Sequence, residues 1–306
     1  MGDAAWKALE VVAARQSGLV TRGQALGAGI AGKVLERWIR AGAVRTMHRG
    51  LYRVAGASDP GDRELRAALL LAGPESVLSH RTAAKAHRLW GIDGCPLEVT
   101  VPRRTLIAVP GLTIHRARLS AEDRGDVAGL AVTSVRRTLW DLAPHVDIVT
   151  LAALFEAARK KDRDLLATTK EWLRTKRHRL PPELGQAIDL IVRDCESRER
   201  PFDSHFEVAF WHRWLFNGLD RPVPQLKVRD RAGNMYIDFA FPNEKVAVET
   251  QGYELRDTRG SFDYDASRTL RLGPLGWQVI PVTKTMFREA FPAVVEQIEG
   301  TRRSRR

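Results

Sequence analysis

Two carboxylates and one amide have the residue types and spacing for metal-dependent chemistry: Asp238, Glu249 and Gln251. Glu249 and Gln251 are two residues apart, so on a strand they share one face. A neighbouring strand that carries Asp238 would bring the second carboxylate beside them. The group offers oxygen ligands to a hard cation, Mg²⁺ or alternatively Mn²⁺, with Asp238 and Glu249 as the metal ligands. Such a cation polarises a phosphodiester and activates water, which predicts phosphodiester hydrolysis.

The residues around this group predict a β-hairpin. Tyr236–Phe241 alternates along its length and is followed by Pro242-Asn243, a pattern typical of a strand and a turn. Val246–Gln251 then predicts the return strand. The competing interpretation makes Asp238 and Glu249 solvated strand carboxylates, which the scarcity of acidic residues in strands disfavours.

A longer series of motifs resembles a known group of nucleases. The spacing of the acidic residues is similar to that of the PD-(D/E)XK nuclease core, and residues 201–298 resemble the Vsr-like endonuclease domains of bacterial proteins. The motifs that carry the resemblance are Ser204-His205-Phe206-Glu207, Ile237-Asp238, Val248-Glu249-Thr250-Gln251-Gly252, Phe262-Asp263-Tyr264-Asp265-Ala266-Ser267-Arg268 and Gly276-Trp277-Gln278-Val279. The resemblance implies a restriction-endonuclease-like mixed sheet flanked by helices. It also implies that Glu207 supports the metal or a water and that Gln251 positions the nucleophile.

The chain departs from this family at two positions. Gln251 stands where the family usually has Asp, and Arg256 stands where it commonly has His. A Gln cannot act as a base, although its amide can contact a phosphate, and the missing His removes a general acid. Glu207 has a second interpretation, because Ser204 and Glu207 have the spacing of a helix capping box. Both roles of Glu207 stay open at this point.

Length and composition indicate a multi-domain protein of a reducing compartment. A chain of 306 residues suggests two or three domains. Cys95 and Cys195 lie far apart and form no metal-ligand spacing, which favours the cytoplasm and no disulfide framework. The N-terminal residues do not have the pattern of a signal peptide. No stretch approaches the roughly 20 apolar residues of a membrane span, so we expect no membrane contact.

The charge distribution indicates where a polyanion would bind. The formal net charge is +12. Residues 1–55 hold 9 basic and 3 acidic residues, residues 56–200 hold 24 and 20, and residues 201–300 hold 12 and 14. The tail 301–306 adds four arginines. We therefore expect affinity for duplex DNA to come from the N-terminal region and the tail.

The first 55 residues predict a winged helix-turn-helix. The expected elements are helices at Trp6–Ala14, Thr21–Leu26 and Lys33–Ile39, and wing strands at Val44–Met47 and Leu51–Val54. Thr21 and Gln24 have the spacing of a capping box that opens the second helix. In the third helix, Lys33, Arg37 and Arg40 share one face, opposite the apolar residues. A helix with one packed side and one basic stripe suits the major groove of DNA.

This region also resembles a known family. The residues that match are Gly18-Leu19-Val20-Thr21-Arg22, Ala28-Gly29 and His48-Arg49-Gly50-Leu51-Tyr52-Arg53-Val54. They are similar to the N-terminal domain of AbiEi-family antitoxins of type IV toxin–antitoxin systems. The resemblance implies binding of operator DNA, with Arg49 at the turn of the wing. A solvated basic helix on a protein-interaction domain is the competing interpretation.

The remaining regions predict scaffold. Residues 56–150 continue an AbiEi-like α+β layout, with a capped helix expected at Ser79–Leu89, a helix at Arg136–Ala143, and strands at Leu97–Val101, Leu112–His115 and Leu130–Val132. Residues 151–200 form a helical connector. Residues 201–300 form the nuclease-like domain, with a strand at Lys227–Val228 and a final helix at Phe287–Glu299, and 301–306 are a basic tail. His80, His87 and His115 are interpreted as core or surface histidines, because no carboxylate or cysteine lies at ligand spacing. The fold class is therefore a multi-domain α/β protein.

Two functions of different classes follow. The first is a Mg²⁺-dependent DNA endonuclease with an appended DNA-binding winged helix, in which Glu207, Asp238, Glu249 and Gln251 form the catalytic site. The alternative is an AbiEi-like antitoxin or transcriptional repressor whose nuclease fold is degenerate. RNA is a third option as the substrate, because phosphodiester chemistry does not separate it from DNA. A homodimer is compatible with either function.

Overall fold

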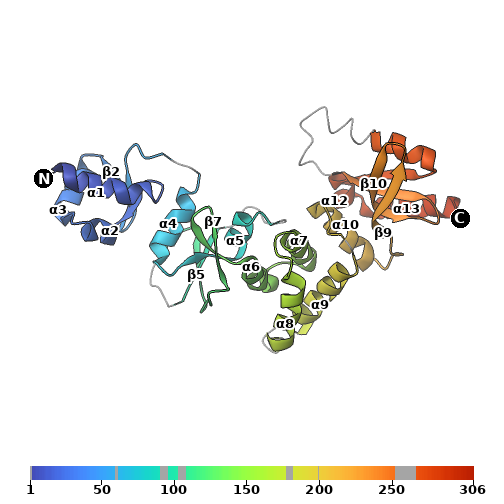
Figure 1. The fold of residues 1–306 in the computed structure, drawn as a ribbon, viewed down its shortest axis with the longest axis horizontal. Coiled ribbons are helices and arrows are strands. Elements are labelled where there is room, and N and C mark those ends of the chain that lie inside the picture. Colours follow the sequence, from blue (N-terminus) through green and yellow to red (C-terminus); the bar gives the residue numbers. More distant parts are fainter. Residues whose placement is uncertain are drawn as a thin grey trace. The chain divides into compact units, whose positions relative to one another are not determined.

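The computed structural model describes residues 2–58, 61–89, 96–102, 108–176, 182–198, 200–251 and 267–306. The protein is a mixed α/β chain that divides into two compact units, Met1–His145 and Val146–Arg306 (Figure 1). Among the described residues, the strands form a three-stranded, a five-stranded and a four-stranded sheet. None of the described helices is both long enough and apolar enough to span a membrane.

The first 55 residues form the predicted winged helix. Its elements are α1 (Gly2–Ala14), β1 (Leu19–Thr21), α2 (Arg22–Gly27), α3 (Gly32–Arg40), β2 (Val44–His48) and β3 (Leu51–Val54), with the strands in the order β1-β3-β2. The predicted capping box is present at the start of α2. The Gln24 backbone N–H donates to Thr21 Oγ1 at 3.1 Å, and the Thr21 N–H donates to Gln24 Oε1 at 2.9 Å. This reciprocal pair fixes where α2 begins.

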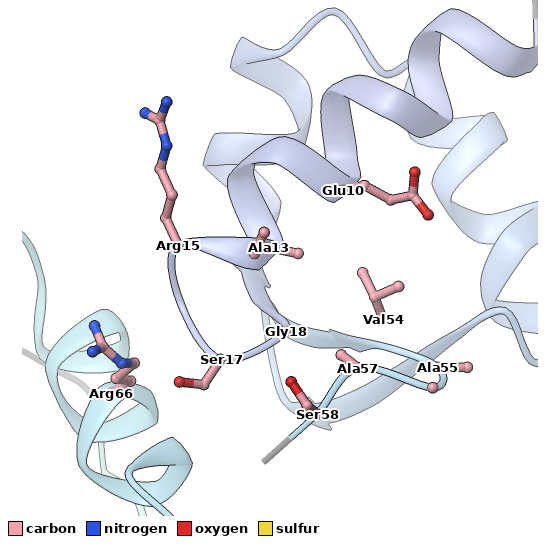
Figure 2. Close-up of a pocket in the computed structure, with 12 residues that line it drawn as sticks. Glu10, Ala13, Arg15, Ser17, Gly18, Val54, Ala55, Ala57, Ser58 and Arg66 are labelled. Atoms are coloured by element: carbon pink, nitrogen blue, oxygen red, sulfur yellow. The ribbon is translucent and has the colours of Figure 1, made fainter. Parts of the chain in front are cut away.

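The winged helix is joined to the next helix, α4 (Arg63–Ala72), by polar contacts. Ser17 Oγ donates to Asp62 Oδ1 at 2.5 Å, and Arg63 Nε donates to the Ser17 carbonyl at 3.0 Å. Figure 2 shows Ser17 on the loop after α1, pointing toward α4. The adjacent Gly18 has φ +82°, and a Cβ there would lie 2.3 Å from the Ala57 Cβ, so a larger residue would strain this loop.

A five-stranded sheet with helices packed on it completes the N-terminal unit. Its further elements are β4 (Val77–Leu78), α5 (His80–Ala86), β5 (Leu97–Val101), β6 (Leu112–Arg116), β7 (Arg124–Val127), β8 (Leu130–Thr133) and α6 (Val135–Leu142). The strand order is β6-β5-β4-β8-β7. The helix α4 packs its apolar side on Val99 and Val132. The start of α5 lies on the other face, where the Glu98 N–H donates to Thr82 Oγ1. The sequence predicted α5, β5, β6, β8 and α6 but not α4, β4 or β7.

The C-terminal unit begins with helices that the sequence predicted only as a connector. They are α7 (Ile148–Arg159), α8 (Leu165–Lys176) and α9 (Pro182–Glu196), followed by α10 (His205–Phe216). Eight consecutive residues of α7, Leu151–Ala158, are buried, and α7 packs against α10. These helices therefore contribute to the core of the C-terminal unit.

The four-stranded sheet of this unit contains the predicted hairpin. The strands are β9 (Val223–Asp230), β10 (Gly233–Phe241), β11 (Val246–Gln251) and β12 (Gln278–Thr283), in the order β12-β11-β10-β9. Strands β10 and β11 are antiparallel, and β11 pairs with β12 in parallel. The hairpin prediction is confirmed. The predicted two-residue strand at Lys227–Val228 is longer, because β9 pairs along most of β10.

Part of the nuclease-like motif series lies outside the described residues. Gly252, Arg256 and the run Phe262–Ala266 fall there, as do Cys95 and most of the basic run after Lys176. Residues 267–272 are helical. The predicted final helix Phe287–Glu299 is two helices, α12 (Lys284–Glu289) and α13 (Phe291–Ser304), which meet at Ala290.

The C-terminal arginines were predicted to supply DNA affinity, and for Arg302 this prediction is wrong. Arg302 lies within α13 and is buried. Its guanidinium pairs with Glu299 at 2.6 Å, Asp220 at 2.9 Å and Glu244 at 3.3 Å. The neighbouring Arg306 also pairs with Glu244, at 3.1 Å. Long-range ion pairing therefore neutralises charge that the sequence assigned to a solvated tail.

Removal of the Arg302 side chain is expected to destabilise the C-terminal unit. Arg302→Ala leaves the 10%-exposed Glu244 carboxylate without this charge partner. Loss of one partner of a buried ion pair costs about 3 kcal/mol. The free energy of unfolding in urea measures the effect. The exposed neighbour Arg303 is the matched control, and equal stability of Arg302→Ala and Arg303→Ala would contradict the structural role.

Candidate functional site

The helix α3 presents the basic stripe that its sequence predicted. Lys33, Arg37 and Arg40 are exposed, whereas Leu35 is fully buried in the core of the winged helix. In the described part of the chain, none of these three cations forms an ion pair. Their charges are therefore available to phosphates or to base edges along one side of α3.

The wing adds a second set of cations. Strands β2 and β3 are joined by a turn in which Arg49 is exposed and Gly50 has φ +79°, a conformation that favours glycine. The ladder between β2 and β3 is irregular between Thr46 and His48. Arg45 is exposed on β2. Sequence reasoning missed it, although its position on an edge strand next to the predicted recognition helix is a usable signal.

The hairpin brings Asp238 and Glu249 to one region of the sheet. In the ladder between β10 and β11, Phe239 lies opposite Val248, and one further step places Asp238 opposite Glu249, where side chains of antiparallel strands share a face. Asp238 Oδ2 accepts hydrogen bonds from the Thr250 N–H and from Thr250 Oγ1, both at 2.8 Å. Asp238 thus also holds the two strands together where the ladder ends.

Glu207 lies in the first turn of α10 and is buried. The N-cap contact is present, with the Glu207 N–H donating to Ser204 Oγ at 3.1 Å. The second contact of a capping box, from the Ser204 N–H to the Glu207 carboxylate, is replaced by others. Glu207 Oε2 accepts from the Asp203 N–H at 3.0 Å, not from the Ser204 N–H, and from Gln225 Nε2 at 2.6 Å. Its carboxylate therefore links the start of α10 to β9, and Gln225 is a partner that sequence reasoning missed.

A guanidinium group contacts the second carboxylate. Arg268 Nη2 donates to Glu249 Oε1 at 2.9 Å and also to the Tyr236 carbonyl. Arg268 belongs to the motif series, and its motif neighbour Asp265 lies outside the described residues. Gln251 ends β11 and is half-buried. A positive charge therefore already balances part of the acidic group.

Burial raises the pKa values of all three carboxyl groups, and repulsion from Asp238 adds to the shift of the other two. Desolvation and the neighbouring Asp238 raise the pKa of Glu207 to about 8. Desolvation and Asp238 also raise the pKa of Glu249 to about 8, although Arg268 opposes the shift. Burial raises the pKa of Asp238, against the two hydrogen bonds from Thr250. Carboxyl groups that resist ionisation together gain from a cation that balances their charge.

The donor set fits a hard cation in its chemistry, and the geometry restricts which residues would hold it. No choice of one oxygen each from Glu207, Asp238 and Glu249 puts the three within 4.8 Å of one another. A cation held by Asp238 and Glu249 alone, with waters in its other positions, remains consistent with the way Mg²⁺ binds to proteins. Glu207 would then act on a water of that cation.

The raised pKa values predict a pH-dependent stability of the C-terminal unit. Glu207 and Glu249 keep their protons when folded up to about pH 8, whereas their ordinary value is 4.5. Their contribution to stability is therefore complete below about pH 4.5 and is lost as the pH rises to about 8. We expect the free energy of unfolding to fall by several kcal/mol between pH 5 and pH 8, because one unit of pKa shift corresponds to about 1.4 kcal/mol for each group. Urea unfolding across this range measures the slope.

Amide variants provide the control for this prediction. Glu207→Gln and Glu249→Gln cannot ionise, so each should flatten the slope. The exposed Glu171 has a lowered pKa, caused first by its hydrogen bond from Arg174, so Glu171→Gln should leave the slope unchanged. A slope that is the same in all three variants would show that the buried carboxyl groups are not its source.

The N-terminal region matches a known family model. Residues 8–55 match the model of a family described as transcriptional regulator, AbiEi antitoxin. Among solved structures, the chain is similar to the RV2827C protein from Mycobacterium tuberculosis, with 13% identity, a TM-score of 0.42, and coverage of 74% of this chain and 88% of that chain. No curated protein matches the chain. The match to the regulator family covers the winged helix only, and the resemblance of residues 201–298 to Vsr-like endonucleases stays a prediction.

Proposed function

We propose that this protein is a DNA-binding transcriptional regulator that reads duplex DNA with α3. One observation carries the proposal. In a segment that matches a family of transcriptional regulators, α3 buries Leu35 in the core and leaves Lys33, Arg37 and Arg40 exposed. Among the described residues these three cations have no ion-pair partner. The packed side fixes the helix, and the basic side is the surface that meets DNA.

The helix α3 and the wing would have different roles in DNA binding. The basic side of α3 would enter the major groove, where Arg side chains can read guanine edges. Arg49 and Arg45 on the wing would contact phosphates, which fix the register of the protein without reading sequence. Both sets release counterions, so the affinity should fall steeply with salt concentration.

Selection from a random duplex library with the full chain tests the proposal. Enrichment of one sequence, followed by a footprint that covers it, supports a regulator that recognises an operator. A two-fold symmetric enriched site would also support a homodimer, because operator symmetry mirrors protein symmetry. Uniform affinity for all duplexes would contradict sequence-specific regulation.

A Mg²⁺-dependent endonuclease is the second candidate function, and the buried carboxylates favour it. Asp238 and Glu249 would hold the cation, which would supply a Lewis acid and a water of lowered pKa. Glu207 would support a water of that cation. Gln251 would orient the nucleophile and cannot deprotonate it. The substrate would be DNA, with RNA as the alternative.

Two observations support the regulator over the endonuclease. The Arg268 guanidinium occupies one Glu249 oxygen at 2.9 Å, so a cation at this carboxylate would compete with a charge that is already present. The Asp238 carboxylate is engaged by Thr250 through two hydrogen bonds. These contacts suit a nuclease-like scaffold that has kept its acidic residues as structural groups.

A further inference from the structure

A polar cluster on the five-stranded sheet of the N-terminal unit has the composition of a transition-metal site. We propose that His80, Glu98 and His115 bind one divalent transition-metal ion of the Zn²⁺ class. One ligand atom from each residue lies within 4.8 Å of those of the other two. Within the described ranges, this is the only trio of His, Cys, Asp or Glu residues that meets this distance. The proposal does not depend on the function of α3 or of the carboxylates near Glu249.

The topology of the sheet explains why these residues meet. Strands β5 and β6 are parallel with Thr100 opposite His115, and Glu98 shares the face of Thr100. His80 opens α5 directly after β4, which pairs with β5. The sequence has no carboxylate at ligand spacing from the histidines, whereas the fold brings Glu98 close to two of them. Glu98 contacts His115 because their strands are neighbours.

One distance between ligand atoms already approaches that around a bound metal. His115 Nε2 lies 3.1 Å from Glu98 Oε1. Donor atoms around a tetrahedral Zn²⁺, with bonds of about 2.0–2.1 Å, are roughly 3.3 Å apart. A metal ion would take the place of the proton that His115 and Glu98 share, and that proton would leave to solvent. The His80 and His115 rings are stacked, 3.6 Å apart at 17°, so they must turn for their in-plane lone pairs to converge.

Hydrogen bonds from neighbouring residues fix the orientation of two of the proposed ligands, Glu98 and His80. Glu98 is buried, and its Oε2 accepts from the Arg81 N–H at 2.8 Å, which leaves Oε1 for a metal. His80 Nδ1 lies 3.0 Å from Ser79 Oγ, which leaves Nε2. Contacts of this kind orient metal ligands and fix the tautomer of the imidazole. The Ser79 side chain therefore contacts His80. It does not cap α5, although the sequence predicts a capped helix there.

Two buried acceptors beside the cluster point to a missing polar partner. Thr100 is 1% exposed, and its Oγ1 has no hydrogen-bond partner among the described residues. Asp141 Oδ2 is buried and likewise without a partner in the described part of the chain, and Asp141 interacts electrostatically with His115. Three protein ligands leave one tetrahedral position for a water. A water held there would supply hydrogen bonds that these oxygens lack.

Metal titration of the full chain tests the proposal. Zn²⁺ calorimetry should give one ion per chain at this site, and Co²⁺ should give the visible absorption of a tetrahedral nitrogen and oxygen site. His115→Ala should lower the affinity by about 100-fold or more, since loss of even a supporting contact costs 10- to 100-fold. Glu98→Gln should act in the same direction. His48→Ala removes a histidine of the wing and should change nothing. Mg²⁺ should not compete, because it prefers oxygen ligands.

A variant that fails to fold would also lose Zn²⁺, so the choice of variant and a measurement on the wild-type chain must exclude this explanation. The His115 side chain is 27% exposed, so its loss should be tolerated better than that of the buried Glu98. Crystals of the wild-type chain grown with Zn²⁺ give a direct measurement through anomalous scattering at the zinc edge. An ion between His80, Glu98 and His115 supports the site. An ion elsewhere, no ion, or equal Zn²⁺ affinity in His115→Ala and His48→Ala overturns it.

Discussion

Charge reversal at Arg37 and Arg40 is expected to reduce the affinity for duplex DNA by on the order of 100-fold at 0.1 M salt. Both side chains are exposed on α3, and no ion pair holds either of them in the described part of the chain. Each lost phosphate contact should lower the slope of log affinity against log salt by about 0.9, so the double variant should lose up to about 1.8. Loss of a contact to a base edge would instead relax the sequence specificity at one position, with little change in the salt slope.

The control must carry the same change in net charge. Arg229 and Arg231 are exposed in the C-terminal unit, at β9 and the turn after it, and reversal of both changes the total charge equally. Filter binding at several salt concentrations compares the two proteins. If both lose affinity equally, the effect is one of net charge, and α3 is not the recognition helix. Wild-type affinity in the α3 variant would reject the assignment outright.

Local patterns predicted the elements that depend on neighbours in sequence. The Thr21–Gln24 capping box sets the start of α2 through residues three apart. The hairpin of β10 and β11 follows from alternation and a turn. The burial of Leu35 and the exposure of Arg37 follow from helical periodicity. These features need no knowledge of the tertiary fold, which is why one sequence suffices for them.

Contacts between distant segments could not be predicted in the same way. Arg302 reads as part of a solvated basic tail, and only the fold places it against Glu244. The meeting of Glu98 with His115 depends on the strand order β6-β5-β4. Arg268 reaches Glu249 across a crossover between parallel strands. Spacing in sequence carries no information on which strands become neighbours, so these partners appear only in three dimensions.

Loss of a metal carboxylate is expected to abolish any metal-dependent nicking by this protein. If Asp238 and Glu249 hold Mg²⁺, either Asp238→Asn or Glu249→Gln should reduce Mg²⁺-dependent nicking of supercoiled plasmid by about 100-fold or more. Binding of DNA by the winged helix should be unchanged. Glu207→Gln should be milder, because an amide oxygen can still accept the hydrogen bond from the Asp203 N–H. Gln251→Lys should retain or raise activity, since it supplies the third residue of the commoner nuclease motif.

The comparison between variants decides between the two proposed functions. Asp230→Asn is the matched control, because this carboxylate is on β9 of the same sheet and pairs with Arg271 at 2.7 Å. Nicking with Mg²⁺ or Mn²⁺ but not with EDTA, which survives Asp230→Asn and disappears in Asp238→Asn, supports the endonuclease. If the wild-type protein binds its operator and nicks no form of DNA, the endonuclease is rejected and the regulator is the function that remains. In that case Asp238 and Glu249 act as structural groups, through Thr250 and Arg268. Arg268→Gln should then destabilise the fold, because it removes the guanidinium that donates hydrogen bonds to the buried Glu249 carboxyl group and to the Tyr236 carbonyl.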